Sequence, residues 1–182
     1  MTVPTDVIVM IDTCPDHATE LADVAAVTFP LACPPGTTDA DTADFIGKNL
    51  TAAHFRDHLS DENRDVVVAR VDGAIVGYSL VLHGDPTDPE VRAVVTQRPV
   101  SELSKMYVLP RAHGAGVAHE LMSTAVSACA ERGSVAVWLG VSNVNLRAQR
   151  FYGKAGFVEV GRKSFWLNGD EQRDFVMVRA LR

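Results

Sequence analysis

The chain carries two kinds of hydrophobic pattern, and each predicts one type of secondary structure. Short apolar runs between turn residues predict strands at 7–11, 66–71, 74–83, 102–108, 135–141, 157–167 and 172–180. Apolar residues that recur every three or four positions predict helices at 15–29, 39–50, 51–59, 117–131 and 145–155. Strands and helices are therefore interleaved along the chain, which predicts an α/β (α+β) fold.

Turn residues fix several of the expected boundaries. Asp72-Gly73 and Asn168-Gly169 each separate two apolar runs, so each predicts a β-hairpin. Thr51 precedes a helical pattern and suits its N-cap, whereas Pro30 is expected to end the first helix. Residues 84–99 are polar and include three prolines, so we expect a mobile loop there.

Composition indicates an ordinary water-soluble protein. The 182 residues fit one domain, 1–182, with 47% hydrophobic and 22% charged residues. No apolar run approaches the roughly 20 residues that span a bilayer. The N-terminal MTVPTDVIVM lacks the basic start and long apolar core of a signal peptide. We therefore expect a cytoplasmic protein without a membrane partner.

Charge and cysteine content argue against further classes. The formal net charge of -6 disfavours a nucleic-acid partner and is compatible with a cationic substrate. Cys14, Cys33 and Cys129 form no CxxC pair, so neither a disulfide framework nor a zinc cluster is expected. His54 and His58 lie four positions apart on a predicted helix, but no third ligand accompanies them. We expect no bound metal ion.

The segment 102–118, which reads ELSKMYVLPRAHGAGVA, carries the clearest chemical signal. A predicted strand ends near Pro110, a turn with Gly114 and Gly116 follows, and a helix begins at Val117. The first amides of a helix have no partner within the helix, and they lie at the positive end of its dipole. Glycines let a ligand approach the backbone closely. This arrangement predicts a phosphate-binding loop.

A second motif follows further along the chain, Asn145-Leu-Arg-Ala148-Gln-Arg-Phe151-Tyr152-Gly-Lys-Ala-Gly156-Phe157. With the loop Val108-Leu-Pro110-Arg-Ala-His113-Gly114-Ala-Gly116-Val-Ala118, it makes the sequence resemble the GCN5-related N-acetyltransferases, the GNAT superfamily. That family's loop has the form Val-x-Pro-x-x-Arg/Gln-Gly-x-Gly-x-Gly/Ala, so His113 stands where Arg or Gln is usual. A second register from Arg111 loses the Val-x-Pro spacing. The second motif, Asn-x-x-Ala-x-x-Phe-Tyr-x-x-x-Gly-Phe, matches at every fixed position.

The resemblance implies a central mixed, mostly antiparallel sheet with flanking helices. In this family the strands equivalent to 102–108 and 135–141 run parallel and then splay apart, and the arm of acetyl-CoA enters the gap. Amides left unpaired by the splaying would bind the pantetheine at Met106 and Val108. The residues that the resemblance implies for cofactor binding are Met106, Tyr107, Val108, His113, Gly114, Ala115, Gly116, Val117, Ala118, Asn145 and Tyr152.

Two residues are implied in the chemistry, and each has a plainer alternative. Tyr152 would donate a proton to the leaving thiolate, since a thiol has a pKa of about 8.5 and a tyrosine about 10. Its alternative is a tyrosine packed in the core. Glu102 would take the proton of the amine, directly or through water, and its alternative is a strand-end carboxylate in solvent. Asn145 could bind the pantetheine, cap its own helix, or do both.

The C-terminal segment narrows the resemblance. Together with Trp138-Leu-Gly-Val141, it resembles the bacterial spermidine/spermine N-acetyltransferases of the Pai type, and it reads Gly161-Arg-Lys-Ser-Phe165-Trp-Leu-Asn-Gly169-Asp170-Glu-Gln172-Arg-Asp174-Phe-Val-Met177. This likeness implies direct transfer of an acetyl group to a small amine, with a polyamine as the expected acceptor. A protein N-terminus, an aminoglycoside or an amino acid stays open as acceptor, as does an acyl-CoA-binding module without turnover. The sequence also leaves open whether the protein is a monomer or a homodimer.

Overall fold

Within residues 6–181, which the computed structural model describes, seven strands form one sheet. Residues 1–5, on which part of the signal-peptide expectation rests, lie outside this range. The sheet order is β1-β2-β3-β4-β5-β7-β6, and among these strands only the neighbours β4 and β5 run parallel. The strands are β1 (Val7–Asp12), β2 (Arg64–Val71), β3 (Ala74–His83), β4 (Val100–Val108), β5 (Ala136–Ser142), β6 (Val158–Leu167) and β7 (Asp170–Ala180).

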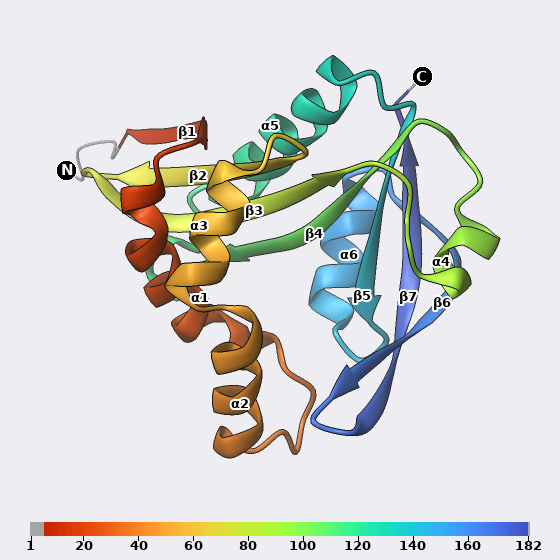
Figure 1. Cartoon of the computed structure of the whole chain (residues 1–182), viewed down its shortest axis with the longest axis horizontal. Coiled ribbons are helices and arrows are strands. Elements are labelled where there is room, and N and C mark those ends of the chain that lie inside the picture. The colour runs from red at the N-terminus through yellow and green to blue at the C-terminus, as the bar shows by residue number, and fades with distance from the viewer. Residues whose placement is uncertain (1–5, 182) are drawn as a thin grey trace.

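Helices lie on both faces of this sheet (Figure 1). They are α1 (Ala18–Ala32), α2 (Asp39–Asn49), α3 (Ala52–Ser60), α4 (Pro89–Val94), α5 (Val117–Glu131) and α6 (Leu146–Lys154), with single 3₁₀ turns at Pro15–His17 and Pro110–Ala112. A mixed, mostly antiparallel sheet with one parallel pair and flanking helices confirms the expected fold class.

Two hydrophobic cores occupy the two faces of β1–β4. Helices α1 and α3 cover one face, where Leu21 and Phe55 pack with Val66 of β2. Helix α5 covers the other face, where Leu121 packs with Val67 of β2. Neighbouring residues of β2 thus enter opposite cores, as a strand buried on both faces requires. Leu21 and Leu121 are both inaccessible to solvent, and burial of such a side chain stabilises the fold by about 1.5–3 kcal/mol.

Both expected hairpins are present. Asp72-Gly73 has φ angles of 50° and 81°, and Asn168-Gly169 has φ angles of 49° and 86°. Two consecutive positive φ angles define the type I′ turn that matches the twist of a hairpin. Thr51 caps α3 as expected, because its Oγ1 accepts the His54 amide at 3.4 Å while His54 Nδ1 accepts the Thr51 amide at 3.3 Å.

The expectation of a loop across 84–99 is wrong, because this segment contains α4. Asp88 caps the helix by accepting the amide of Glu90 at 2.8 Å, and a proline follows at the first helical position. Val91 and Val95 are fully buried in a cluster with residues of β5 and β7. In the sequence, the signal for this helix was the four-residue spacing between Val91 and Val95. The prolines and polar residues around these two valines obscure it.

Helix α1 extends beyond its expected end. Pro30 lies inside the helix, and the chain stays helical to Ala32. A proline removes one backbone hydrogen bond, and close to a C-terminus few residues follow that the break can disturb. The additional residues bring Leu31, Ala32 and Cys33 to the cavities described below.

A series of buried, hydrogen-bonded polar side chains connects β2, β3 and β4 away from the candidate site. His83 Nε2 lies 2.6 Å from Asp65 Oδ2, and His83 Nδ1 lies 2.8 Å from Ser101 Oγ. The order Asp, His, Ser is that of a hydrolytic triad, but Ser101 is 0% exposed and hydrogen-bonds onward to Ser134 at 2.7 Å. Neither cavity of the candidate site reaches these residues. These hydrogen-bonded side chains therefore hold β2, β3 and β4 together, and their role is structural.

Candidate active site

The parallel strands β4 and β5 separate soon after they meet. Their register pairs Val100, Ser101 and Glu102 with the start of β5, and the pairing ends at Glu102 opposite Trp138. In Figure 1, β1–β4 lie across the picture, whereas β5, β6 and β7 lie at a steep angle to them. A gap therefore opens between the carboxyl-terminal halves of β4 and β5, as the resemblance implied.

A β-bulge in β4 lies beside the point of separation. Leu80 of β3 pairs with Lys105, and Val81 pairs with Leu103, so Ser104 is an extra residue without a partner. A bulge bends its strand and increases the local twist. This bend accounts for the divergence of β4 from β5. The hydrophobic pattern along β4 does not indicate the bulge.

Backbone amides of β4 face the gap. The amide of Leu109 donates to the carbonyl of Val76 at 2.7 Å, on the side of β3. Successive residues of a strand direct their backbone groups to opposite sides. The amides of Met106 and Val108 consequently point to the side that β5 has left, which is the arrangement expected for those two residues.

A cavity of about 440 Å³, here called the loop cavity, lies beside the turn between β4 and α5. Gly114 and Gly116 line it with φ angles of 80° and 77°, a left-handed conformation that glycine adopts readily. Gly116 is the N-cap of α5 and supplies no side-chain cap. Within the described chain, the amides of Val117, Ala118 and His119 have no hydrogen-bond acceptor. These free amides at the positive end of α5 suit a phosphate.

The expected loop residues line this cavity with the exception of Ala115. His113 Nε2 lies 2.9 Å from the carbonyl oxygen of Val108, so the imidazole closes the end of the gap. Arg147 of α6 lies 3.5 Å from His113 Nδ1, and both Arg147 and His119 line the cavity. Sequence reasoning missed Arg147, which occupies a variable position of the second motif and adds a positive charge beside the free amides.

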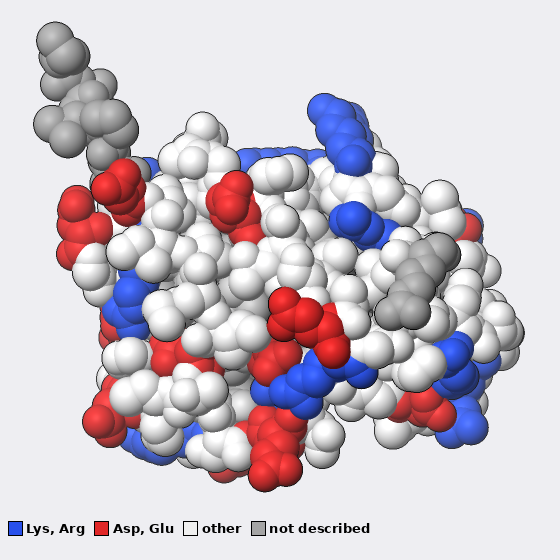
Figure 2. All heavy atoms as spheres, turned by 90° about the horizontal axis from the view of Figure 1, so that it is seen from above, with Lys and Arg blue, Asp and Glu red and all other residues white. Residues whose placement is uncertain are grey.

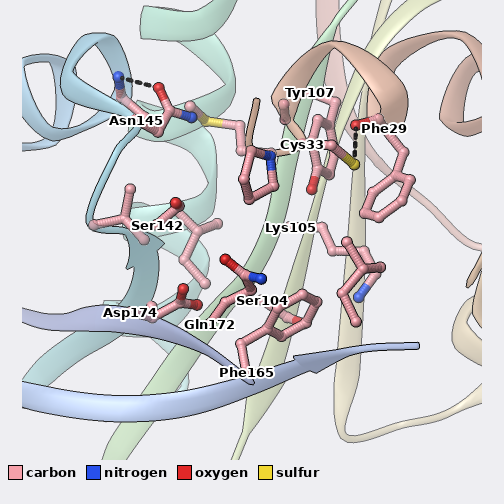
Figure 3. A pocket seen from close by; sticks show the side chains of 18 of the residues that line it. Phe29, Cys33, Ser104, Lys105, Tyr107, Ser142, Asn145, Phe165, Gln172 and Asp174 are labelled. Carbon is pink, nitrogen blue, oxygen red and sulfur yellow. Dashed lines mark hydrogen bonds between the residues drawn. The ribbon is translucent and has the colours of Figure 1, made fainter. Parts of the chain in front are cut away.

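A second cavity of about 340 Å³, here called the β4–β5 cavity, fills the gap itself. Two carboxylates and two lysines line it from three strands, namely Glu102, Lys105, Lys163 and Asp174. Figure 3 shows Lys105 and Asp174 among the side chains around this space. Of these four, only Glu102 was expected, because the others lie at strand positions where the sequence does not show which way a side chain points.

Aromatic rings form another part of the wall of the β4–β5 cavity. Phe29 and Phe45 stack with ring centroids 4.4 Å apart, and Phe165 lies 5.8 Å from Phe45. They come from α1, α2 and β6, so three distant segments meet here. A ligand in this cavity would contact charged groups and an apolar surface together.

The two cavities meet at residues that line both of them, namely Ala32, Met106, Tyr107, Asn145, Ala148 and Tyr152. Asn145 is the N-cap of α6, where its Oδ1 accepts the amide of Ala148 at 3.1 Å. The capping alternative is therefore confirmed. The Nδ2 of Asn145 still has donors for a ligand at the junction.

Tyr152 stands at the junction and also packs against aromatic neighbours. Its ring centroid lies 5.6 Å from that of Phe151 and 6.0 Å from that of Phe157. Burial raises the pKa of Tyr152 to about 12. The hydroxyl therefore keeps its proton near neutral pH and can serve as a donor there.

Glu102 lies at the narrow end of the gap, in the last residue pair between β4 and β5. Burial raises the pKa of Glu102, and the positive charges of Lys105 and Lys163 oppose that rise. Burial also lowers the pKa of Lys105, while the charge of Glu102 acts in the opposite direction. A carboxylate whose pKa is raised towards the working pH is a stronger base than an ordinary glutamate.

The paired histidines of α3 serve local structure. His54 takes part in the cap described above, and His58 Nδ1 lies 2.7 Å from a guanidinium nitrogen of Arg64. Burial, assisted by that cation, lowers the pKa of His58 to about 4. Within residues 6–181, no group of three or more His, Cys, Asp or Glu side chains is placed to hold a metal ion.

The surface charges and the apolar character of the helices bear on the expectations about nucleic-acid and membrane partners. On the face shown in Figure 2, acidic and basic side chains are interspersed. In the part of the chain that the structure describes, no helix combines the length and apolar character needed to cross a membrane.

Comparison with known proteins agrees with this architecture. A model of the acetyltransferase (GNAT) family matches residues 33–157. An uncharacterized N-acetyltransferase of Mycobacterium tuberculosis is 45% identical over 164 residues, which are 90% of this chain and 97% of that protein. The chain therefore belongs to the acetyltransferase (GNAT) family, and the expectation of an N-acetyltransferase enzyme is confirmed.

Solved structures share the fold at low sequence identity. The PaiA N-acetyltransferase of Thermoplasma acidophilum, solved in complex with coenzyme A, has a TM-score of 0.72 and 16% identity, covering 95% of this chain and 99% of that one. Aminoglycoside 6′-acetyltransferase type Ii has a TM-score of 0.68 and 19% identity, covering 96% of this chain and 97% of that one. At these identities the likeness shows the fold.

Proposed function

We propose that the protein transfers the acetyl group of acetyl-CoA directly to a small primary amine. One observation carries this proposal: the loop cavity and the β4–β5 cavity meet at Met106, Asn145 and Tyr152. One cavity offers free amides suited to phosphate, and the other offers a carboxylate suited to an amine. Two reactants bound from opposite ends would meet at the junction, and such placement supplies much of the rate of a two-substrate reaction.

The residues of the loop cavity fit coenzyme A. Free amides at the start of α5 would hold its pyrophosphate, with Arg147 as an additional positive charge. The gap-facing amides of Met106 and Val108 would hydrogen-bond its pantetheine arm. The structure of PaiA with coenzyme A, a protein of the same fold, supports this assignment. When bound, acetyl-CoA supplies an electrophilic thioester carbonyl and a thiol leaving group.

Three groups, two at the junction and Glu102 in the β4–β5 cavity, divide the chemistry. Glu102 accepts the proton that the amine must lose, directly or through water. A backbone amide near Met106 hydrogen-bonds the carbonyl oxygen as negative charge develops on it. Tyr152 donates a proton to the departing sulfur. A bond forms between nitrogen and the acetyl carbon, the carbon–sulfur bond breaks, and the products are an N-acetyl amide and free coenzyme A.

The role of Glu102 predicts a specific pH dependence. Its raised pKa means that the base is lost as pH falls, at values above the 4.5 of an ordinary glutamate. We expect an acidic limb in the pH profile of kcat/KM, and Glu102→Gln should remove this limb and lower kcat by about 10²–10⁴-fold. Glu131→Gln, which removes an exposed carboxylate at the end of α5, is the control. An unchanged profile in Glu102→Gln would assign the proton to another acceptor.

An acceptor screen tests the proposed function itself. Release of free thiol from acetyl-CoA is measured with polyamines, amino acids, aminoglycosides and a short peptide. The Pai-type resemblance favours spermidine or spermine, and we expect at least one small amine to be acetylated. Two acidic residues of α2 are already engaged, since Asp41 accepts a hydrogen bond from Asn168 and Asp44 pairs with Lys48. Tight binding of acetyl-CoA without turnover on any amine would instead support a binding module.

A further inference from the structure

Two lysines share the β4–β5 cavity with two carboxylates, and within residues 6–181 none of these four side chains takes part in an ion pair. Other buried charged residues of the sheet are paired, for example Asp65 of β2 with Arg132 at 3.2 Å. Removing a charge from water is costly unless a partner compensates for it. The four charges act on one another across the cavity, but none makes a close ion pair within the described part of the chain, so a charged ligand can contact each of them directly.

The lysines reach the cavity from different walls. Lys105 belongs to β4, whereas Lys163 belongs to β6 and stands directly opposite Asp174 of β7. Lys163 passes close over β5 at Gly140, where an added Cβ would lie 2.8 Å from Lys163 Cε. Its Nζ lies 6.0 Å from the centroid of the Phe165 ring. Because Gly140 has no side chain, the methylene groups of Lys163 fit over β5. The Phe165 ring lies beside the ammonium group of Lys163.

Coenzyme A does not account for these two cations. The residues suited to its phosphates surround the loop cavity, and neither Lys105 nor Lys163 lines that cavity. Both lysines line only the β4–β5 cavity, on the side where the acceptor would enter. Their natural partner is therefore an anionic group of the acceptor.

We propose that the acceptor is an amine that also carries a carboxylate, an amino acid or a close analogue, whose carboxylate is held by Lys105 and Lys163. Its amine is directed to Glu102 and the junction. The rings of Phe29, Phe45 and Phe165 contact the apolar part of the molecule. This inference rests on the proposed function and replaces its polyamine acceptor with a zwitterionic one.

Charge balance distinguishes the two kinds of acceptor. Glu102 and Asp174 offset Lys105 and Lys163, so a zwitterion leaves the occupied cavity balanced. A polyamine brings several positive charges and no negative one. Some of its ammonium groups would lie near the lysines, where repulsion in a partly dehydrated cavity exceeds its value in water.

Matched acceptors isolate the contribution of the carboxylate. Phenylalanine, phenylalaninamide and 2-phenylethylamine share a ring and an amine, and only the first is anionic at its acid group. The pair 6-aminohexanoate and hexylamine repeats the comparison with a longer spacing, and spermidine represents the polyamines. We expect kcat/KM to be at least about tenfold higher for the carboxylate in one of the two series, carried mainly by KM.

Single substitutions assign that preference to the lysines. Lys105→Gln and Lys163→Gln should each reduce the ratio of kcat/KM between a carboxylate acceptor and its neutral counterpart by about tenfold. Lys163→Arg should keep part of the ratio, because the positive charge remains. Lys154→Gln is the matched control, since it removes an exposed lysine of α6 that lines neither cavity. The ratio should be the same in this control as in the wild type.

A binding measurement separates this inference from the proposed function. Calorimetry compares N-acetylphenylalanine and N-acetyl-2-phenylethylamine, the products, on the protein saturated with coenzyme A, and the anionic product should bind more tightly. A neutral amine or spermidine as the best acceptor, or lysine variants with an unchanged ratio, overturns the zwitterionic acceptor while the acetyltransferase stands. Absence of acetyl-CoA binding or of transfer to any amine overturns the proposed function as well.

Discussion

Tyr152→Phe is expected to lower kcat by about 10²-fold or more, because it removes the proposed proton donor for the departing thiolate and little else. The phenylalanine ring keeps the contacts with Phe151 and Phe157, so the affinity for acetyl-CoA should stay close to that of the wild type. The measurement is steady-state kinetics with the best acceptor, together with calorimetry of acetyl-CoA binding.

Tyr78→Phe is the matched control for this substitution. The hydroxyl of Tyr78 is buried, has no hydrogen-bond partner among residues 6–181 and lines neither cavity, so its loss should leave kcat unchanged. Because the pKa of Tyr152 is raised to about 12, ionisation of Tyr152 should not reduce the wild-type rate below that pH. Equal kcat values for Tyr152→Phe and the wild type, with chemistry limiting turnover, would mean that the sulfur takes its proton from another source.

Gly116→Glu is expected to weaken acetyl-CoA binding by about 100-fold or more, which corresponds to about 2.8 kcal/mol. The new side chain would extend from the N-cap of α5 into the space beside the free amides and would place a carboxylate where a phosphate is expected. An added Cβ at this position meets no atom of the described residues within 4 Å, so the obstruction would act on the ligand. Calorimetry with acetyl-CoA measures the change.

Gly133→Glu controls for backbone strain and charge in that experiment. Gly133 lies just beyond the other end of α5, has a φ of 88° against 77° at Gly116, and also has open space around its Cβ position. A non-glycine residue in the left-handed region costs roughly 1–2 kcal/mol, and both variants bear this cost. Near-normal affinity in folded Gly116→Glu would exclude the loop as the phosphate site.

The sequence predicted the parts of the site that lie on one continuous segment. A strand, a turn with Gly114 and Gly116, and the start of a helix are adjacent in the chain, so their relative geometry follows from local rules. The same holds for Asn145, whose cap depends on the backbone three residues later. Hairpin turns with two consecutive positive φ angles were equally local.

The remaining parts depended on tertiary structure. Lys163 and Asp174 become neighbours because β6 and β7 pair in one register, and a shift by one residue would turn every side chain to the other face. Phe45 reaches the same cavity from α2, a helix whose contact with the β6–β7 hairpin includes Asn168 to Asp41 at 3.0 Å. No local sequence pattern encodes these tertiary contacts, so this part of the β4–β5 cavity could not be predicted from the sequence.

The bulge at Ser104 determines which charged side chains of β4 lie on the same face of the strand. Residues three apart in a regular strand point to opposite faces, yet Glu102 and Lys105 line one cavity because the extra residue reverses the alternation. Deleting Ser104 would remove the bulge and its bend, and Glu102 and Lys105 would then be two positions apart, a spacing that keeps them on one face of a regular strand. The extra residue thus places the proposed base beside a proposed acceptor-binding cation and also bends β4 away from β5, so the same bulge that opens the cavity helps to set its charges.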